Sequence, residues 1–284
     1  MRTCFSDWMH WMIGLGVLGL IDFQGALAQE YEPLRRDDGS TWSTEEIETD
    51  RDSFTPATSL VGHRRWIVES AYTFIDNRRV YETHSLPELL VRYGVTERLE
   101  WRFGTNYEIG GAGNPVSGNI PDVLPDEPML EEETTISYGI KYGVTNQSGW
   151  MPKSAILVSG FTPVAGEATG TDLSVAYLGG WTFANRWVLD QAIRYNTGSF
   201  EEDDFNIWAP STVLKVPVGE RWKAHIEYFG IFSDGRERET VQHFISPGAH
   251  YLFTRNLELG SRFGWGLSDD SPNFFINIGG GIRF

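Results

Sequence analysis

Strict alternation of apolar with small or polar side chains is the feature that most restricts how this chain can fold. The last twelve residues read NFFINIGGGIRF. In a strand, neighbouring side chains point to opposite faces. The two faces of this segment are therefore Phe274, Ile276, Ile278, Ile282 and Phe284 on one side, and Asn277, Gly279, Gly281 and Arg283 on the other. The pattern predicts a strand that has one apolar face and ends on an aromatic residue.

The same period of two begins at Trp66 and continues to the end of the chain. Alternation and turn residues together predict about twelve strands. Their expected ranges are 65–74, 84–94, 99–108, 132–143, 154–161, 173–183, 186–196, 205–216, 221–232, 241–253, 257–266 and 273–284. These lengths suit strands that cross a bilayer at a tilt, which takes about 9 to 11 residues.

Short and longer links between these strands tend to alternate. VTER, AN, PVGE and TRN are short, whereas TPVAGEATGTD, TGSFEEDD and residues 109–131 are longer and polar. Tight turns on one rim and longer loops on the other are typical of outer-membrane barrels. The sequence therefore predicts an all-β fold, a transmembrane antiparallel up-and-down β-barrel of about 12 strands. An even strand count places both termini on the short-turn side, which is expected to be periplasmic.

Aromatic side chains on the apolar faces also favour a membrane barrel. In LEWRFGTNYE, Trp101 and Phe103 alternate with Glu100 and Arg102. So much exposed aromatic surface must be covered, and a bilayer covers it. Four tryptophans near the short turns predict a girdle at the membrane interface: Trp101, Trp181, Trp187 and Trp222.

The first 62 residues show no such period. Residues 13–21 are an apolar core followed by Ala26-Leu27-Ala28, which predicts a signal peptide over 1–28. Residues 29–62 are acidic and turn-rich, as expected of an irregular periplasmic tail or plug, and residues 63–284 would form the barrel. The formal net charge of −16 disfavours binding to nucleic acid or to anionic head groups.

Two features depart from the pattern. SAILVSGF is apolar on both faces, with Leu157 and Phe161 opposite Ile156 and Val158. Prolines at 87, 210 and 247 fall inside predicted strands, where a hydrogen-bond donor is lost. They predict bulges, local breaks or displaced boundaries.

Charged residues on the polar faces are the candidates to line the lumen. They are Glu69, Glu88, Arg92, Glu100, Arg102, Lys141, Asp190, Arg194, Lys223, His225, Glu227, Glu258, Arg262 and Arg283. Both signs occur in similar numbers, which predicts a paired polar network across the lumen. A solute path along the same residues is the alternative.

Catalysis and metal binding find little support in the sequence. His243 and His250 fall on opposite faces of one predicted strand, and Ser246 lies in no Gly-x-Ser-x-Gly elbow. His225 and Glu227 share a face, but two residues make no metal site. We expect neither an enzyme nor a bound cofactor or metal.

Three stretches carry a family resemblance: IETDRDSFTPATSLVGHRRWIVESAY at 47–72, YGVTERLEWRFG at 93–104 and the terminal strand. They are similar to a bacterial outer-membrane transporter family labelled MetA-pathway of phenol degradation, although Asp52 stands where that family commonly has proline. The resemblance implies a secreted β-barrel, with Glu69 in its first strand. The ending on Phe284 resembles the signal that the outer-membrane assembly machinery recognises.

These observations predict a cell outer membrane channel or transporter for small, by family analogy hydrophobic or aromatic, solutes. Its expected partners are the lipid bilayer, the assembly machinery and a solute that the sequence does not name. The alternatives are a non-conducting structural or adhesive barrel and a soluble secreted β-protein.

Overall fold

The computed structural model describes residues 46–51, 53–118, 132–166, 170–184, 186–200, 203–236 and 239–284. The expected signal peptide, the tail up to residue 45 and residues 119–131 lie outside these ranges. Within them the chain forms twelve strands and no helix. The strands are β1 (Trp66–Asp76), β2 (Thr83–Gly94), β3 (Leu99–Gly110), β4 (Glu132–Thr145), β5 (Lys153–Ala165), β6 (Asp172–Thr182), β7 (Val188–Phe200), β8 (Asp203–Val218), β9 (Trp222–Asp234), β10 (Val241–Thr254), β11 (Leu257–Gly266) and β12 (Phe274–Arg283).

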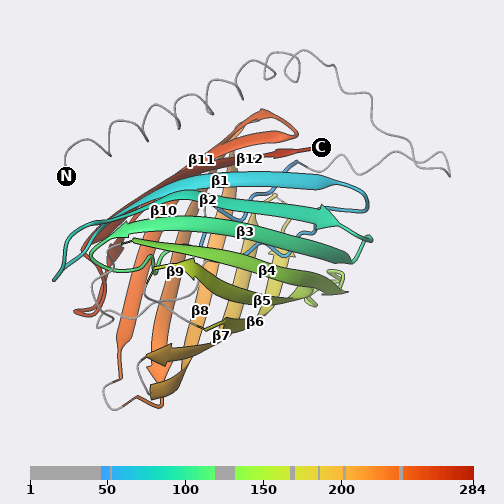
Figure 1. Cartoon of the computed structure of the whole chain (residues 1–284). Coiled ribbons are helices and arrows are strands. Elements are labelled where there is room, and N and C mark those ends of the chain that lie inside the picture. The colour runs from blue at the N-terminus through green and yellow to red at the C-terminus, as the bar shows by residue number, and fades with distance from the viewer. Residues whose placement is uncertain are drawn as a thin grey trace, which may run out of the picture. The chain divides into compact units, whose positions relative to one another are not determined.

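Each strand pairs antiparallel with its neighbours in sequence, and β1 pairs with β12 to close a barrel (Figure 1). At the closure, the backbone N–H of Phe284 donates to the carbonyl of Trp66 over 2.9 Å, and that of Trp66 donates to Phe284 over 3.2 Å. All backbone edges are thereby paired, which is what a strand fold in lipid requires. The predicted all-β, up-and-down barrel is confirmed.

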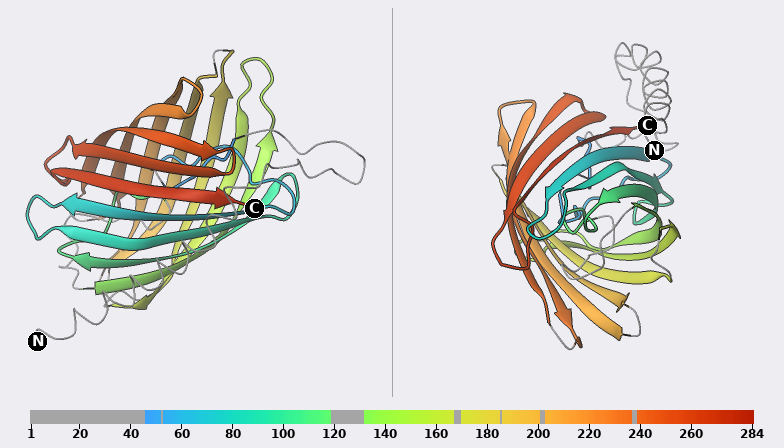
Figure 2. Two further views of the ribbon diagram at one scale, coloured as in Figure 1. Left: turned by 90° about the horizontal axis from the view of Figure 1, so that it is seen from above. Right: turned by 60° about the vertical axis from the view of Figure 1, so that its left-hand side comes forward.

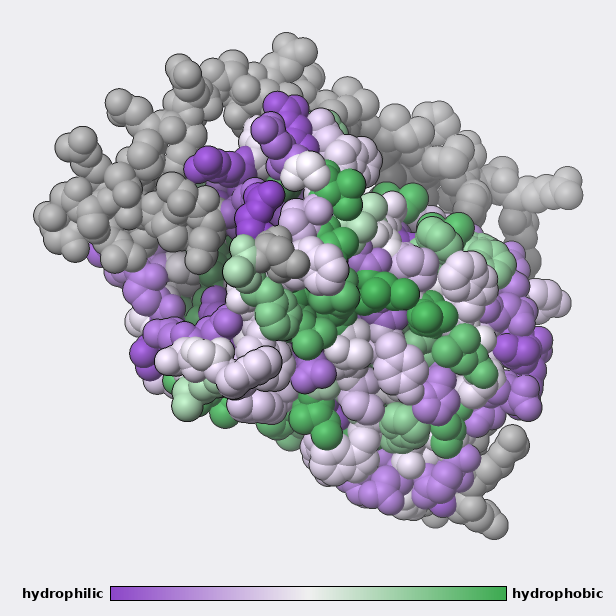
Figure 3. Space-filling model, turned by 180° about the vertical axis from the view of Figure 1, so that it is seen from behind, coloured by the Kyte–Doolittle hydropathy of each residue, from purple (hydrophilic) through white to green (hydrophobic). Residues whose placement is uncertain are grey.

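The alternation in the sequence separates an inner from an outer face. On β3, Glu100 and Arg102 are buried, whereas Trp101 and Phe103 are 46% and 53% exposed. The same division holds around the wall. Figure 3 shows one outer face, on which hydrophobic and pale aromatic residues form a band with hydrophilic residues toward its margins.

We call the end where β1 begins and β12 ends the terminal end, and the opposite end the loop end. Two links predicted at the loop end are shorter than expected, because β5 continues to Ala165, and β7 and β8 continue to Phe200 and Asp203. The polar residues of these links keep their backbone hydrogen bonds to the neighbouring strand. Solvent-exposed hairpin ends tolerate polar side chains, so polarity alone did not mark the strand boundary.

The three strand prolines behave differently from one another. At Pro87, the register between β2 and β3 shifts between Ser85 and Glu88, which is the predicted bulge. Pro210 and Pro247 interrupt the pairing on one side of their strands without shifting the register. They are local breaks, as expected where a ladder donor is missing.

Candidate functional site

The predicted lumen residues are nearly all buried on the inner face. Those with an exposed fraction of 5% or less are Glu69, Glu88, Arg92, Glu100, Arg102, Lys141, Asp190, Arg194, His225, Glu227, Glu258 and Arg262. Lys223 is more open, with a side chain 26% exposed. Arg283 is half-buried at the terminal end, where its Nε donates to Asn256 Oδ1 over 3.0 Å.

The predicted girdle residues lie on the outer face near the terminal end. Trp101, Trp187 and Trp222 are 46%, 43% and 52% exposed. Trp181 is half-buried, and its indole Nε1 donates to the carbonyl of Trp150 over 3.0 Å. One apolar end and one hydrogen-bonded end suit a tryptophan at a membrane interface.

The lumen is occupied by the chain itself. Residues 46–51 and 53–61, which we call the lumen segment, run inside the barrel, where they form the blue trace in Figure 2. Ile47, Asp50, Arg51, Phe54 and Thr55 are each 1% exposed or less. This part of the predicted tail is therefore packed against the inner wall.

Asp50 is the hub of a buried ion-pair network in the terminal half of the barrel. Its Oδ2 lies 2.7 Å from Arg102 Nη1 and 3.7 Å from both Arg92 Nη1 and Lys141 Nζ. Burial by itself raises the pKa of Asp50, but the three cations outweigh burial and hold that pKa well below its ordinary value of 3.8. Asp50 is therefore ionised in the closed lumen.

Wall carboxylates hold the backbone of the lumen segment. Glu69 Oε2 accepts hydrogen bonds from the N–H groups of Asp50 and Arg51, over 2.7 and 3.1 Å. Glu227 accepts from the N–H groups of Phe54 and Thr55, over 3.1 and 2.7 Å. A segment without secondary structure thus has its buried donors satisfied by charged side chains.

Two further acids anchor the start of the segment. Glu48 Oε1 lies 2.6 Å from Lys215 Nζ, and Glu46 Oε2 lies 2.9 Å from Lys223 Nζ. Burial raises the pKa of Glu48, but Lys215 outweighs that effect and lowers the pKa overall. Ile47 packs in a small apolar cluster with Val61, Ile67 and Leu252.

The loop half of the lumen holds an apolar core around Phe54. Its ring stacks on Phe229 with centroids 4.2 Å apart, and Phe229 stacks on Phe244 at 4.5 Å. The guanidinium of Arg194 lies 4.5 Å above the Phe54 centroid, and its Nη2 donates to the Phe54 carbonyl over 3.2 Å. Phe54 is thus held by both stacking and a cation–π contact.

The chain after β3 also enters the lumen. Asn114 and Val116 are fully buried. Asn114 Nδ2 donates to Glu88 over 3.0 Å, and Arg262 donates to the Val116 carbonyl. Gly118 approaches the lumen segment so closely that a Cβ there would lie 2.1 Å from the Phe54 carbonyl oxygen. Two separate stretches of chain are therefore packed together inside the barrel.

A cavity of ≈20 Å³ remains between Gly118 and strands β2 to β7, enough for one or two water molecules. Arg102 and Arg194 line it, together with the serines at 137, 159 and 174 and the apolar side chains Leu90, Leu157 and Phe161. Leu157 and Phe161 are the inward residues of SAILVSGF, so the stretch that is apolar on both faces supplies an apolar strip to a polar lumen.

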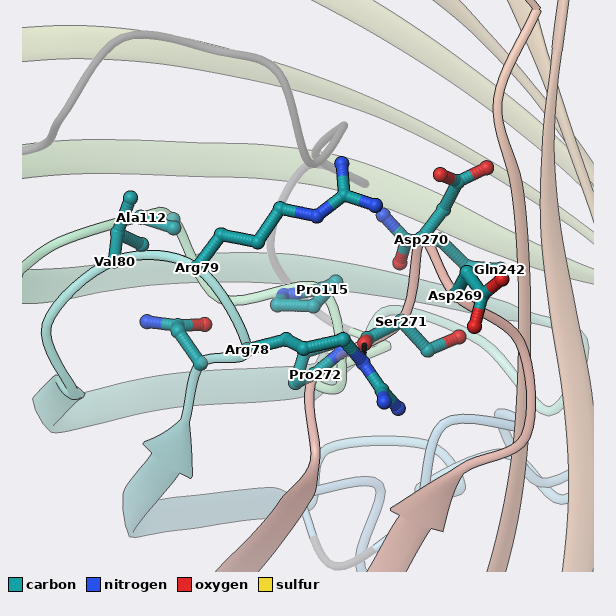
Figure 4. Close-up of a pocket in the computed structure, with 12 residues that line it drawn as sticks. Arg78, Arg79, Val80, Ala112, Pro115, Gln242, Asp269, Asp270, Ser271 and Pro272 are labelled. Atoms are coloured by element: carbon teal, nitrogen blue, oxygen red, sulfur yellow. Dashed lines mark hydrogen bonds between the residues drawn. The ribbon is translucent and has the colours of Figure 1, made fainter.

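A second cavity, of ≈40 Å³, lies at the loop end (Figure 4). Arg78 and Arg79 of the β1–β2 link face Asp269 and Asp270 of the β11–β12 link. Arg78 Nε donates to the Ser271 carbonyl over 3.1 Å. Both charge signs line this mouth, so it is no single-sign filter.

His243 and His250, which were considered for catalysis, lie on opposite faces of β10. His243 faces outward and contacts the Tyr228 hydroxyl at 2.7 Å, whereas His250 faces inward and contacts His225 at 2.7 Å. Ser246 donates to the Phe263 carbonyl instead, over 3.3 Å. The described residues include no group of three or more side chains that could hold a metal. No helix among them is long and apolar enough to span a membrane.

Several residues that lie in the lumen were not predicted from the sequence. The alternation of Glu46, Glu48 and Asp50 with Ile47 and Thr49 is a short period-two pattern that could have indicated a segment with two environments. The sequence contains no comparable pattern that predicts the burial of Arg51, Phe54 or the stretch at 111–118. Their partners lie far away in sequence, as for Ser53 and Glu227, 174 positions apart.

Comparisons with known proteins agree with this geometry. The COG4313 outer membrane channel from Pseudomonas putida F1 is 11% identical with a TM-score of 0.56, and the match covers 84% of this chain and 100% of that one. The NanC porin is 8% identical with a TM-score of 0.52, over 77% of this chain and 100% of that one. Both likenesses concern the fold.

No curated protein matches the sequence. The sequence profile of a family described as "Putative MetA-pathway of phenol degradation" matches residues 49–284. That range takes in the barrel and most of the lumen segment. The chain therefore belongs to this MetA-pathway family and has the fold of an outer membrane β-barrel.

Proposed function

We propose that this protein is an outer membrane channel for small solutes, which include hydrophobic and aromatic ones by analogy with the family, and that the lumen segment closes it. Both termini would lie in the periplasm. The observation that carries the proposal is the way the segment is held. Side chains of β1 to β4, β7 to β9 and β11 bind it mainly through ion pairs and hydrogen bonds, which can be broken and remade without unfolding the wall.

The wall supports this reading because most of its charges also pair with one another. Arg92 contacts Glu69 and Glu100 at 3.0 and 2.8 Å, and Arg262 contacts Glu227 at 2.8 Å. Lys215 and Asp190 are 3.2 Å apart. Removal of the segment would therefore leave few charges without a partner. Such unpaired charges are usually what makes the opening of a buried polar site energetically unfavourable.

The filled lumen favours one other function, a structural or adhesive barrel that does not conduct. Such a barrel would use the same network as a permanent core. The two functions differ in what happens when the network is weakened: a channel opens, and a structural barrel loses stability without passing solutes.

Liposome swelling separates them. Wild-type protein and a Glu48→Gln/Asp50→Asn variant would be reconstituted and tested with sugars and small acids of increasing size. The channel proposal expects slow swelling for wild type and faster swelling for the variant, with unchanged heat-modifiable migration on gels as the folding control. Folded variant protein that gives no swelling above empty liposomes would support the structural barrel instead.

A further inference from the structure

Lys141 stands out within the ion-pair network. Its side chain is fully buried, and its Nζ makes no hydrogen bond to any residue in the described part of the chain. Its contact with Asp50 Oδ2, at 3.7 Å, is too long for a hydrogen bond. A buried ammonium group normally has its protons accepted by oxygen atoms, so this position can bind an anion more closely than Asp50 does.

The surroundings of Lys141 suggest which anion. Lys141 pairs in register with Leu157, which lines the ≈20 Å³ cavity beside Arg102 and Arg194. The cavity thus joins two kinds of surface. One is a cationic corner, where Arg102 lines the cavity and Lys141 lies just outside the lining as the register partner of Leu157. The other is an apolar wall that includes Leu157 and Phe161.

The lumen segment already presents matching chemistry to this region. It places the Asp50 carboxylate on Arg102 and Lys141, and the Phe54 ring against the guanidinium of Arg194. A carboxylate and a phenyl ring are therefore the two groups that the wall accepts here. The cavity itself is too small for a six-membered ring, so a ligand that carries both groups must displace part of the segment.

We propose that the Lys141–Arg102–Arg194 region is a binding site for small aromatic carboxylates, which compete with Asp50 and Phe54 and so release the lumen segment. The carboxylate binds between Lys141 and Arg102. The ring lies against Leu157 and Phe161, with the Arg194 guanidinium at its face. This inference rests on the proposed function, because it names the solute class that would open the channel.

Segment release can be followed without measuring conduction. Thr55 is fully buried in the segment, and its Oγ1 has no hydrogen-bond partner in the described ranges, so Thr55→Cys removes no bond. In a Cys4→Ser background, the folded full-length protein in detergent would be labelled with a small maleimide. Labelling would be timed with benzoate, acetate, benzyl alcohol or chloride added at about 10 mM, a concentration suited to weak ligands.

We expect benzoate to speed labelling by about tenfold, and acetate and benzyl alcohol by less than about twofold, since each carries only one of the two groups. Lys141→Met should abolish the benzoate effect. The matched control is Lys223→Met, which also removes a lysine paired with the segment, through Glu46, but lies on β9, whereas Lys141 is the register partner of the cavity residue Leu157.

Equal effects of benzoate and acetate would overturn the proposal in favour of a simple anion site. Equal effects of benzoate and benzyl alcohol would overturn it in favour of an apolar one. Unchanged labelling in benzoate, or a benzoate effect that survives Lys141→Met, would also overturn it. Faster labelling without any solute flux would remove only the channel function, and flux without benzoate-dependent labelling would remove only the binding site.

Discussion

Asp50 in the lumen segment and Arg102 in β3 form a buried ion pair, 2.7 Å between Oδ2 and Nη1, although 52 positions separate them in the sequence. The pair connects a stretch without secondary structure to the wall of a closed barrel. The following predictions rest on the proposal that such charge pairs hold the segment in place and so close the lumen.

Asp50→Asn should weaken the binding of the lumen segment to the wall, while the strand pairing of the barrel stays intact. Loss of one partner of a buried ion pair costs about 3–5 kcal/mol when the other charge is left unpaired. Arg92 and Arg102 keep their pairs with Glu100 in this variant, so we expect a cost at or below the lower end of that range. We expect a higher open probability in planar bilayers and a lower midpoint of heat modification. Glu46→Gln is the matched control, because its pair with Lys223 is partly exposed and worth about 1 kcal/mol or less. Similar conductance changes in both variants would show that Asp50 is no hub.

The closed state should resist mild acid. The pKa of Asp50 is below 3.8 in the closed lumen, whereas a released aspartate titrates near about 4. Its contribution to closure is therefore complete above about pH 4 and is lost only as the pH falls through the lower, closed-state pKa. Conductance measured between about pH 8 and 5 should stay flat and rise only in stronger acid. A midpoint between about pH 5 and 8 would instead show that a group other than Asp50 controls closure.

Gly118→Ala should separate the two stretches that fill the lumen. The new Cβ would lie 2.1 Å from the Phe54 carbonyl oxygen, a contact that only backbone movement can relieve. We expect faster liposome swelling with normal barrel assembly. Gly179→Ala is the control, since its Cβ would meet only Pro152 at 3.9 Å and should change nothing. An unaltered swelling rate for Gly118→Ala would mean that this contact does not maintain closure.

Deletion of Phe284 should impair barrel closure and delivery to the outer membrane. The backbone of Phe284 makes two hydrogen bonds with Trp66 at the β1–β12 seam, and its side chain is 65% exposed. We expect less heat-modifiable protein in outer membrane fractions, whereas Phe284→Tyr should restore the wild-type level. Equal levels for the deletion and the wild type would remove the assembly role of this residue.

The wall of the barrel could be predicted closely because strand periodicity is a local property. The expected and observed boundaries of β11 coincide at 257–266, and the bulge at Pro87 follows from a missing N–H group. The inward-facing charged residues could be predicted for the same reason, because once the outward face of a strand is known, the other face is fixed.

The closed lumen could not be predicted in this way. Arg51 and Phe54 lie beyond the short alternation that ends at Asp50. The wall residues that bind the segment are spread from Glu69 in β1 to Glu258 in β11. Those contacts depend on three-dimensional closure. Lys141 illustrates the limit: the sequence placed it on the inner face, but its lack of a hydrogen bond among the described residues is visible only in the folded barrel.

The central claim is that the lumen segment closes a channel, and single-channel recording of a 46–61 deletion tests it most directly. The wild type and the deletion variant would be recorded in planar bilayers, each after gels have verified a folded barrel. We predict a conductance step for the deletion that is several times larger than any step of the wild type. Equal conductance in the two proteins, or none in either, would contradict the claim.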